Sequence, residues 1–437
     1  MPMNAVKVNP FKPNSPVPTG LFVGRRRELE RIQSHLRQTR AGNPSNFMIT
    51  GERGIGKSSL LLFAKFLADG SIVMDHERLK FLVVDTDLDA KTTQMGLVKK
   101  LELGLRRSLA VSEPAREVWK RVWEFMQRVE IQGSRISTKE DVQLDEVVME
   151  EFCYSLAETC ERVCGVAADG KELKTGHNGI LFLLDEADNA SAELDLGSML
   201  KLMSERLQRK SCNNVMFGLA GLPALRDVLH GSHPSSLRLF EELPLGRLSD
   251  GEVNQVLDLC LESASEQAKQ EIGLTQRARE QLVFFAEGYP HFIQQFGYSA
   301  FSVDTDYEID EDDVLQGAFG TRGALEQIGD RYYRDDFYNR IQKDSYRQVL
   351  RIMADGLDEW IRKREIRERF SGKDSDLSNA IYALRERNII QSKEGVRGVY
   401  RLRHKGFALW IKLHTTDPQE LQREVREPEA RSDKAAL

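Results

Sequence analysis

Cysteine is scarce in this chain of 437 residues and forms no recognisable pattern. The five cysteines are odd in number and include no Cys-x-x-Cys pair, so the sequence indicates neither a disulfide framework nor a zinc site. Cys160 and Cys164 stand four residues apart and would share one face of a helix. We interpret them as small buried apolar side chains rather than as metal ligands.

Long apolar runs are also lacking. The sequence has no stretch of 18 or more apolar residues that could cross a membrane. Its first 18 residues hold five prolines and no apolar stretch of the kind found in secretory signals. We therefore expect a cytoplasmic protein without a membrane partner. A hydrophobic share of 41% excludes a wholly disordered chain, and 437 residues predict two to four domains at roughly 100 to 200 residues each.

Neither sign of charge dominates the whole chain. Lys and Arg number 62 against 68 Asp and Glu, a net charge of -6, which excludes a uniformly basic nucleic-acid coat. The charges are unevenly placed, however, because residues 345–414 hold 16 Lys and Arg against 9 Asp and Glu. That region carries +7 and the rest of the chain -13. Any nucleic-acid contact is therefore expected near the C-terminus.

Short apolar segments alternate with helical periodicity in the first half of the chain. This alternation predicts an α/β fold with a parallel sheet and crossover helices. The expected strands are residues 46–50, 81–85, 180–184 and 215–220, and the expected helices are residues 25–40, 59–68 and 192–209. Between the second and third strands, residues 90–175 read as a helical insertion with a polar break at 132–135.

The pattern changes to helices alone after residue 243. Helical spacing there predicts helices at residues 250–264, 275–287 and 290–302. Three further helices are expected at residues 346–354, 363–370 and 376–388, followed by two short strands around the turn at 394–398. Three helices followed by a hairpin is the order of a winged-helix domain.

Residues 51–58 match the phosphate-loop pattern G-x-x-x-x-G-K-[ST] in full, between an apolar strand and a helix. The glycines allow backbone N–H groups to turn toward phosphates, and Lys57 can neutralise phosphate oxygens. The Ser58 hydroxyl can reach a magnesium ion. The motif predicts ATP and Mg²⁺ as cofactors, with these nucleotide-binding residues: Gly51, Glu52, Arg53, Gly54, Ile55, Gly56, Lys57, Ser58 and Ser59.

Acidic residues follow the strand expected at residues 180–184. Asp185 would stand beside the magnesium ion, and Glu186 could orient or deprotonate an attacking water. This pair favours ATP hydrolysis over binding alone, with Lys57 and Glu186 as catalytic residues. Asp188 is a weaker candidate, and the alternative is that these carboxylates only solvate the end of a strand.

Four motifs together resemble the AAA+/STAND ATPases related to the origin-recognition and replication-initiator ATPases. They are Phe22-Val23-Gly24-Arg25, the phosphate loop, the run Leu-Phe-Leu-Leu-Asp-Glu-Ala-Asp at 181–188, and Gly-Tyr-Pro-His at 288–291. The resemblance spans about residues 20 to 414, and bacterial members of that group often end in a winged helix. It implies a P-loop NTPase sheet with a helical lid and a C-terminal winged-helix domain.

The resemblance also implies roles for residues outside the phosphate loop. Val23, Gly24 and Arg25 would lie against the adenine, and Pro290 and His291 in the lid would lie over the nucleotide. Members of the family assemble so that an arginine of one subunit enters the site of the next. Homo-oligomerisation is therefore expected, with Arg238 as the best match for that catalytic arginine, followed by Arg226 and Arg247.

Two departures from the family pattern predict slow turnover. Residues 218–221 read Gly-Leu-Ala-Gly, where AAA+ enzymes usually carry a polar sensor, and His291 stands at the position of the lid arginine. Both departures favour a switch over a fast motor. The expected organisation is an extended arm at 1–20, an ATPase core at 21–243 with an insertion at about 90–175, a helical lid and connector at 244–329, a winged helix at 330–414 and a disordered tail at 415–437.

The last expected helix of the winged-helix region could enter a DNA major groove, and the turn after it could contact the DNA backbone. Asp376 would cap this helix. The candidate contacts to double-stranded DNA are Ser378, Asn379, Tyr382, Arg385, Lys393 and Arg397. The alternative is a regulatory or sensor ATPase, for example in defence against phage or mobile elements, whose winged helix recruits a protein effector.

Overall fold

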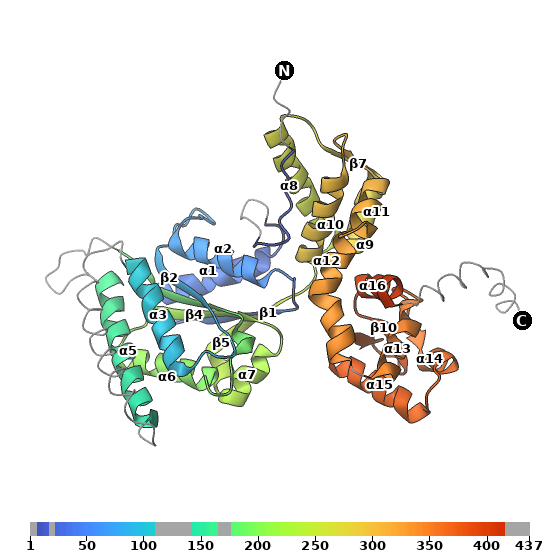
Figure 1. Cartoon of the computed structure of the whole chain (residues 1–437). Coiled ribbons are helices and arrows are strands. Elements are labelled where there is room, and N and C mark those ends of the chain that lie inside the picture. Colours follow the sequence, from blue (N-terminus) through green and yellow to red (C-terminus); the bar gives the residue numbers. More distant parts are fainter. Residues whose placement is uncertain (1–6, 17–21, 110–140, 165–175, 342, 416–437) are drawn as a thin grey trace, which may run out of the picture. The chain divides into compact units, whose positions relative to one another are not determined.

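The computed structural model describes residues 7–16, 22–109, 141–164, 176–341 and 343–415 (Figure 1). The chain divides into two compact units, and each is described by itself. The sheet unit is Pro16–Arg247, and the helical unit combines Met1–Ser15 with Leu248–Leu437. The polar break expected at 132–135 lies outside the described residues, as do residues 416–437 of the tail expected at 415–437, whereas Thr415 itself is helical.

The sheet unit contains five parallel strands in the order β2-β3-β4-β1-β5. The α/β fold with a parallel sheet, predicted from the alternating pattern, is confirmed. Strand β4 lies between β1 and β3, so the strand that leads into the phosphate loop and the strand that ends in Asp185 are separated by one strand. The strands are β1 (Asn46–Gly51), β2 (Phe81–Asp87), β3 (Gly179–Asp185), β4 (Val215–Gly221) and β5 (Phe240–Leu245).

The sequence did not predict β5. This strand contains Glu241, Glu242 and Pro244, which interrupt the apolar pattern that revealed the other four strands. Proline cannot donate a hydrogen bond within a sheet and is tolerated mainly on edge strands. Strand β5 is such an edge, since it pairs only with β1. The domain boundary expected after residue 243 therefore falls inside a strand.

Helices cover both faces of the sheet, which is why its strands read as continuous apolar runs. Figure 1 shows α1 and α2 on one face, and α3, α5, α6 and α7 on the other. The bounds of these helices are α1 (Arg26–Arg40), α2 (Lys57–Asp69), α3 (Gln94–Leu109), α5 (Asp141–Cys164), α6 (Leu196–Arg209) and α7 (Leu225–Ser232). Among all the residues that the structure describes, no helix is long and apolar enough to span a membrane.

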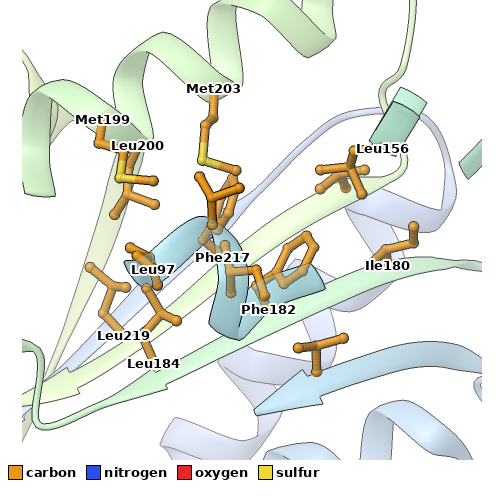
Figure 2. Close-up of a cluster of buried hydrophobic side chains, with 14 of the residues drawn as sticks. Leu97, Leu156, Ile180, Phe182, Leu184, Met199, Leu200, Met203, Phe217 and Leu219 are labelled. Carbon is orange, nitrogen blue, oxygen red and sulfur yellow. The ribbon is translucent and has the colours of Figure 1, made fainter. Parts of the chain in front are cut away.

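Alternate residues of the central strands build a core cluster with the helices on one face of the sheet. Phe182 of β3 and Phe217 of β4 stack with their ring centroids 5.5 Å apart, facing Met203 of α6 (Figure 2). Leu156 of α5 and Leu97 of α3 complete the same cluster. This packing fixes the positions of β3 and β4, and with them the carboxyl ends of both strands.

The helical unit begins with five helices and a short pair of parallel strands. Ser249 caps α8 through a capping box, and Thr275 caps α9. The helices are α8 (Asp250–Ala268), α9 (Gln276–Ala286), α10 (Pro290–Val303), α11 (Glu311–Phe319) and α12 (Ala324–Ile328), and the strands are β6 (Gly273–Leu274) and β7 (Glu308–Ile309). The sequence predicted the first three helices and missed the last two.

The N-terminal arm is anchored to this unit where the structure describes it. Lys7 forms an ion pair with the buried Asp304, and Asn9 Nδ2 donates to the Tyr298 carbonyl oxygen at 2.9 Å. The ring of Phe11 packs so closely on α10 that a Cβ at Gly297 would lie 2.4 Å from it. Residues 7–11 thus lie along α10.

The remaining elements of the helical unit follow α12 without a break. Two π-helical segments, Gly329–Tyr333 and Asp335–Arg340, extend it toward the C-terminal elements. These are α13 (Asp344–Ala354), β8 (Ile361–Arg362), α14 (Lys363–Arg369), α15 (Asp374–Glu386), β9 (Ile390–Ser392), β10 (Val399–Leu402) and α16 (Lys405–Thr415). Strand β10 pairs antiparallel with both β8 and β9.

Three expectations for this region were wrong in detail. Helix α15 begins at Asp374 with Lys373 as its N-cap residue, so Asp376 lies in the first turn and does not cap the helix. The sheet has a third strand, β8, of only two residues, too short to produce a sequence pattern. The sequence did not predict helix α16. Trp410 of this helix packs closely on Gly329, where a Cβ would lie 2.1 Å from the Trp410 ring.

Candidate functional site

The phosphate-loop residues lie at the carboxyl edge of the sheet, where α/β folds bind ligands. Gly51 ends β1, and Lys57 begins α2. Gly54 and Gly56 have φ angles of 79° and 98°, a left-handed conformation that favours glycine. A Cβ at Gly51 would lie 2.8 Å from the Ile55 side chain, so this position also requires glycine. The loop therefore turns tightly into a helix N-terminus, an arrangement suited to anions.

Lys57 is held partly buried at the start of α2. Its Nζ donates to the carbonyl oxygens of Gly51 and Glu52, each at 2.9 Å. Burial lowers the pKa of the Lys57 ammonium below its usual value, while the carboxylates of Asp188, Asp185 and Glu186 act in the opposite direction. The structure thus brings the phosphate-loop lysine and the acidic residues after β3 into one electrostatic neighbourhood.

The three acidic residues after β3 have different surroundings. Asp185 is half-buried, and its Oδ1 accepts the Glu186 N–H at 2.8 Å. Glu186 is exposed, has a left-handed φ of 52°, and accepts a bond from Asn189 Nδ2 at 3.2 Å. Asp188 Oδ1 instead accepts the Leu222 N–H at 2.8 Å, just beyond the end of β4. Asp188 therefore ties the ends of β3 and β4 together.

A polar chain that the sequence did not reveal runs from β1 to β5. Thr50 Oγ1 donates to Glu242 Oε1 at 2.7 Å, and Arg226 Nη1 donates to Glu242 Oε2 at 2.5 Å. Arg226, the second candidate for the catalytic arginine, is therefore paired within its own chain. The sequence did not reveal these hydrogen bonds because Glu242 belongs to β5, the strand without an apolar pattern.

Arg25 braces the phosphate loop. The residue has a φ of 60°, and its Nη2 donates to the Ile55 carbonyl oxygen at 3.2 Å and to the Gly246 carbonyl oxygen at 2.6 Å. Its side chain is only 8% exposed. The adenine contacts expected for Val23, Gly24 and Arg25 stay predictions, but the Arg25 guanidinium joins the loop to the segment after β5.

The other nucleotide-site candidates are dispersed. Arg238 is exposed on the short 3₁₀ helix Ser236–Leu239, and its side chain forms no hydrogen bond or ion pair with the described residues. Pro290 and His291 begin α10 in the helical unit, where His291 Nε2 lies 3.2 Å from Arg331 Nη1. Their role against the nucleotide stays a prediction.

Four of the DNA-contact candidates have exposed side chains, and one of them, Arg385, pairs with Glu386 at 3.6 Å. Asn379 and Tyr382 are exposed on α15, and Tyr382 is 61% exposed. Arg385 is exposed on the same helix, and Arg397 is exposed in the turn between β9 and β10. Lys393 Nζ lies 5.8 Å from the centroid of the Trp360 ring. Ser378 is engaged, since its hydroxyl accepts from Lys363 Nζ at 2.9 Å and donates to the Asp374 carbonyl oxygen at 2.8 Å.

Replacing Arg25 with Ala is expected to loosen the phosphate loop. The change removes two hydrogen bonds from a nearly buried guanidinium and leaves two carbonyl oxygens without them, a loss of about 1–3 kcal/mol. Urea denaturation of the sheet unit measures this loss. The matched control is Arg26→Ala, because that side chain is 88% exposed and its ion pair with Glu30 lies on the helix surface. Equal midpoints for the two variants would contradict the brace.

The chain resembles known proteins in sequence over part of its length and in fold over most of it. Residues 21–211 match a family model described as an AAA ATPase domain. No curated protein matches the chain in sequence. The ORC2 protein of Aeropyrum pernix, solved as ADPNP-ADP complexes, has a TM-score of 0.55 at 14% identity, over 94% of this chain and 99% of that one.

Two further archaeal structures are more distant. The ADP form of the same ORC2 protein has a TM-score of 0.47 at 16% identity, over 93% of this chain and 96% of that one. Cdc6p from Pyrobaculum aerophilum has a TM-score of 0.44 at 14% identity, over 92% and 97%. These two scores are too low to support an argument. Residues 21–211 thus resemble an AAA ATPase domain, and the chain shares its fold with an archaeal ORC2 protein.

Proposed function

We propose that this protein is a slow ATP-hydrolysing switch that oligomerises and couples its nucleotide state to DNA binding through a C-terminal winged helix. The observation that carries the proposal is the meeting of Lys57, Asp185 and Glu186 at one edge of the sheet. A phosphate-binding lysine beside two carboxylates on neighbouring elements is the arrangement that nucleotide hydrolysis requires.

The loop suits a nucleotide polyphosphate. The left-handed glycines, the close approach at Gly51 and the partly buried Lys57 ammonium provide backbone donors and one positive charge for phosphate oxygens. Among the described residues, no group of three or more His, Cys, Asp or Glu side chains could hold a metal by itself. Mg²⁺ needs no such group, since it is usually held by one or two protein oxygens together with phosphates and waters.

Ser58 and Asp185 are the residues that would hold Mg²⁺. Bound there, the ion would neutralise charge on the phosphate oxygens. Glu186 is the general base of the proposal because its carboxylate is exposed next to Asp185 and could accept a proton from water. Slow turnover follows from the absence of a polar side chain in residues 218–221 and from His291 in place of an arginine.

Replacing Glu186 with Gln should lower ATP hydrolysis by about 10²- to 10⁴-fold, the usual contribution of a general base. ATP binding should persist, because Lys57 and the loop glycines are unchanged. Steady-state phosphate release and binding of labelled ATP measure the two effects separately. Glu193→Gln serves as the control because Glu193 is also an exposed glutamate of the sheet unit. Unchanged hydrolysis in Glu186→Gln would reject the assigned base.

The oligomer proposal depends on Arg238. An arginine that acts on a neighbouring subunit must be free within its own chain, and among the three candidates Arg238 is the exposed one without a described side-chain partner. Arg226 is held by Glu242 instead. In a neighbouring site the Arg238 guanidinium would stabilise charge that develops during phosphoryl transfer.

Mixing variants tests whether Arg238 acts between subunits. Arg238→Ala alone should lose ATPase activity, by up to ~10³-fold if its contribution resembles that of other such arginines. Adding Lys57→Ala protein, whose own site is inactive but which keeps Arg238, should restore part of the activity. Arg226→Ala should retain activity without mixing. Failure of every mixing ratio to restore hydrolysis would count against an arginine supplied by the neighbour.

The DNA proposal rests on charge and exposure in residues 345–414. This region carries +7 on an otherwise acidic chain, and Tyr382, Arg385 and Arg397 are exposed on α15 and on the turn after β9. The order α13, α14, α15 and then the β9–β10 hairpin is that of winged-helix domains, in which the third helix enters the major groove.

One observation favours the alternative, a regulatory ATPase whose winged helix recruits a protein effector. Asp374 and Asp376 lie in the first turn of α15, the end at which recognition helices commonly contact DNA. Their carboxylates would repel phosphates unless paired, and Asp374 is paired with Arg367. A protein surface with basic groups would tolerate this helix end better than DNA would.

Duplex DNA binding by the full chain distinguishes the two. We expect an affinity that falls steeply with salt, and the double variant Arg385→Ala with Arg397→Ala should reduce the slope of log K against log salt by about 2 if both arginines contact phosphates. Arg277→Ala is the control because this arginine is 83% exposed on α9, outside the basic region. Absence of binding at low salt would favour the protein effector.

A further inference from the structure

A cavity of about 580 Å³ lies between α5 and the turn that follows α6, away from the phosphate loop. Three of the chain's five cysteines line it, namely Cys160 and Cys164 on α5 and Cys212 in the turn. Polar side chains including Glu161 and Lys210 share the lining. Cys160 is buried as the sequence predicted, whereas Cys164 and Cys212 are half-buried at the cavity.

The three thiols line one cavity, and Cys160 has side-chain hydrogen bonds with both Cys164 and Cys212. The Sγ atoms of Cys160 and Cys164 lie 3.9 Å apart across one helical turn. Cys212 is held by its N–H, which donates to the Leu207 carbonyl oxygen at 3.0 Å, and it follows Ser211, whose φ is 59°. The cluster therefore joins α5 to the turn that leads into β4.

The thiols also differ in protonation. A hydrogen bond with Cys160 lowers the pKa of Cys212, outweighing the effect of burial. Hydrogen bonds with Cys164 and with Cys212, together with burial, raise the pKa of Cys160. At Cys153 and Cys260 burial is the largest cause, and it raises their pKa values to about 12 and about 11. Cys212 is thus the thiol of this cluster that favours the thiolate, with Cys160 as the proton donor beside it.

We propose that Cys212 is an oxidation-sensitive thiol that reacts with a hydroperoxide and then forms a reversible disulfide with Cys160. An accessible thiol with a second thiol in contact is the arrangement found in redox-sensing sites. In a reducing compartment such disulfides are transient and regulatory rather than structural.

The chemistry balances with hydrogen peroxide as the oxidant. The Cys212 thiolate attacks one peroxide oxygen, the O–O bond breaks, and the sulfur becomes a sulfenic acid while the departing hydroxide takes a proton from solvent to form water. The Cys160 sulfur then attacks the sulfenic sulfur, forming the S–S bond. The S–O bond breaks, and the oxygen leaves as water with the proton of Cys160. Two thiols lose two electrons, and one peroxide becomes two waters.

The first step also removes one obstacle to the second. One hydrogen bond that raises the pKa of Cys160 is made to the Cys212 sulfur. That sulfur carries no negative charge once it is a sulfenic acid, so this stabilisation of the Cys160 proton disappears. The resulting disulfide would join α5 to the amino-terminal side of β4, at the edge of the sheet opposite the phosphate loop. The proposal is therefore independent of the proposed ATPase activity.

Native full-length protein treated with equimolar hydrogen peroxide provides the test. Mass spectrometry of the unreduced digest should identify a Cys160–Cys212 disulfide that disappears on treatment with dithiothreitol. Cys160→Ser should stop the reaction at the sulfenic acid of Cys212, which a 1,3-dicarbonyl reagent traps. Cys212→Ser should give neither product. Alkylation of Cys212 should be more than about tenfold faster than that of Cys153 or Cys260, because those thiols are buried and protonated.

Controls separate this site from general oxidation. Cys153→Ser and Cys260→Ser should form the disulfide as the wild type does, and circular dichroism confirms that each variant is folded. A disulfide that links Cys164 to Cys212 would overturn the assignment of Cys160. Absence of both sulfenic acid and disulfide at Cys212, with folded protein, would overturn the whole proposal.

Discussion

The parallel pairing of β1, β4 and β3 is the constraint on which the candidate site depends. It brings the ends of β1 and β3 to one edge of the sheet, with β4 between them. Asp188 reinforces this alignment by accepting the Leu222 N–H just beyond β4. The carboxylates after β3 then act electrostatically on the partly buried Lys57 ammonium, whose Nζ is bonded to backbone carbonyl oxygens, and the proposed function assigns these charges to a phosphate and its metal.

Much of this arrangement could be predicted because the central strands are covered on both faces. Their apolar runs marked four of the five strands to within two residues, and the phosphate loop and Asp185-Glu186 followed directly from the sequence. Strand β5 escaped because its outer position permits Glu242 and Pro244. The pairing of Glu242 with Thr50 and Arg226 escaped with it, since no local pattern reveals which side chains a parallel sheet brings together.

The C-terminal elements show a second limit of sequence patterns. The number and order of helices from α13 to α15 were predicted, whereas α16 was missed because its apolar residues follow β10 almost directly and read as a continuation of it. The sequence also did not reveal which side chains form hydrogen bonds with the exposed polar residues. Ser378 has the spacing of an outward-facing contact, yet its hydroxyl is occupied by Lys363 from another helix. Helical spacing indicates which face of a helix a residue occupies, but it does not indicate which side chains from other elements contact that residue.

The proposed switch requires a path from the phosphate loop to the helical unit, and the backbone that joins the two units provides one. Only two links join the units, one at Ser15–Pro16 and one at Arg247–Leu248. On the sheet side of the second link, Arg25 joins Gly246 to the phosphate-loop residue Ile55. On the helical side, the Leu248 N–H donates to the Gly288 carbonyl oxygen, two residues before Pro290. One guanidinium and a short stretch of backbone therefore connect the phosphate loop to the residues that lead to α10.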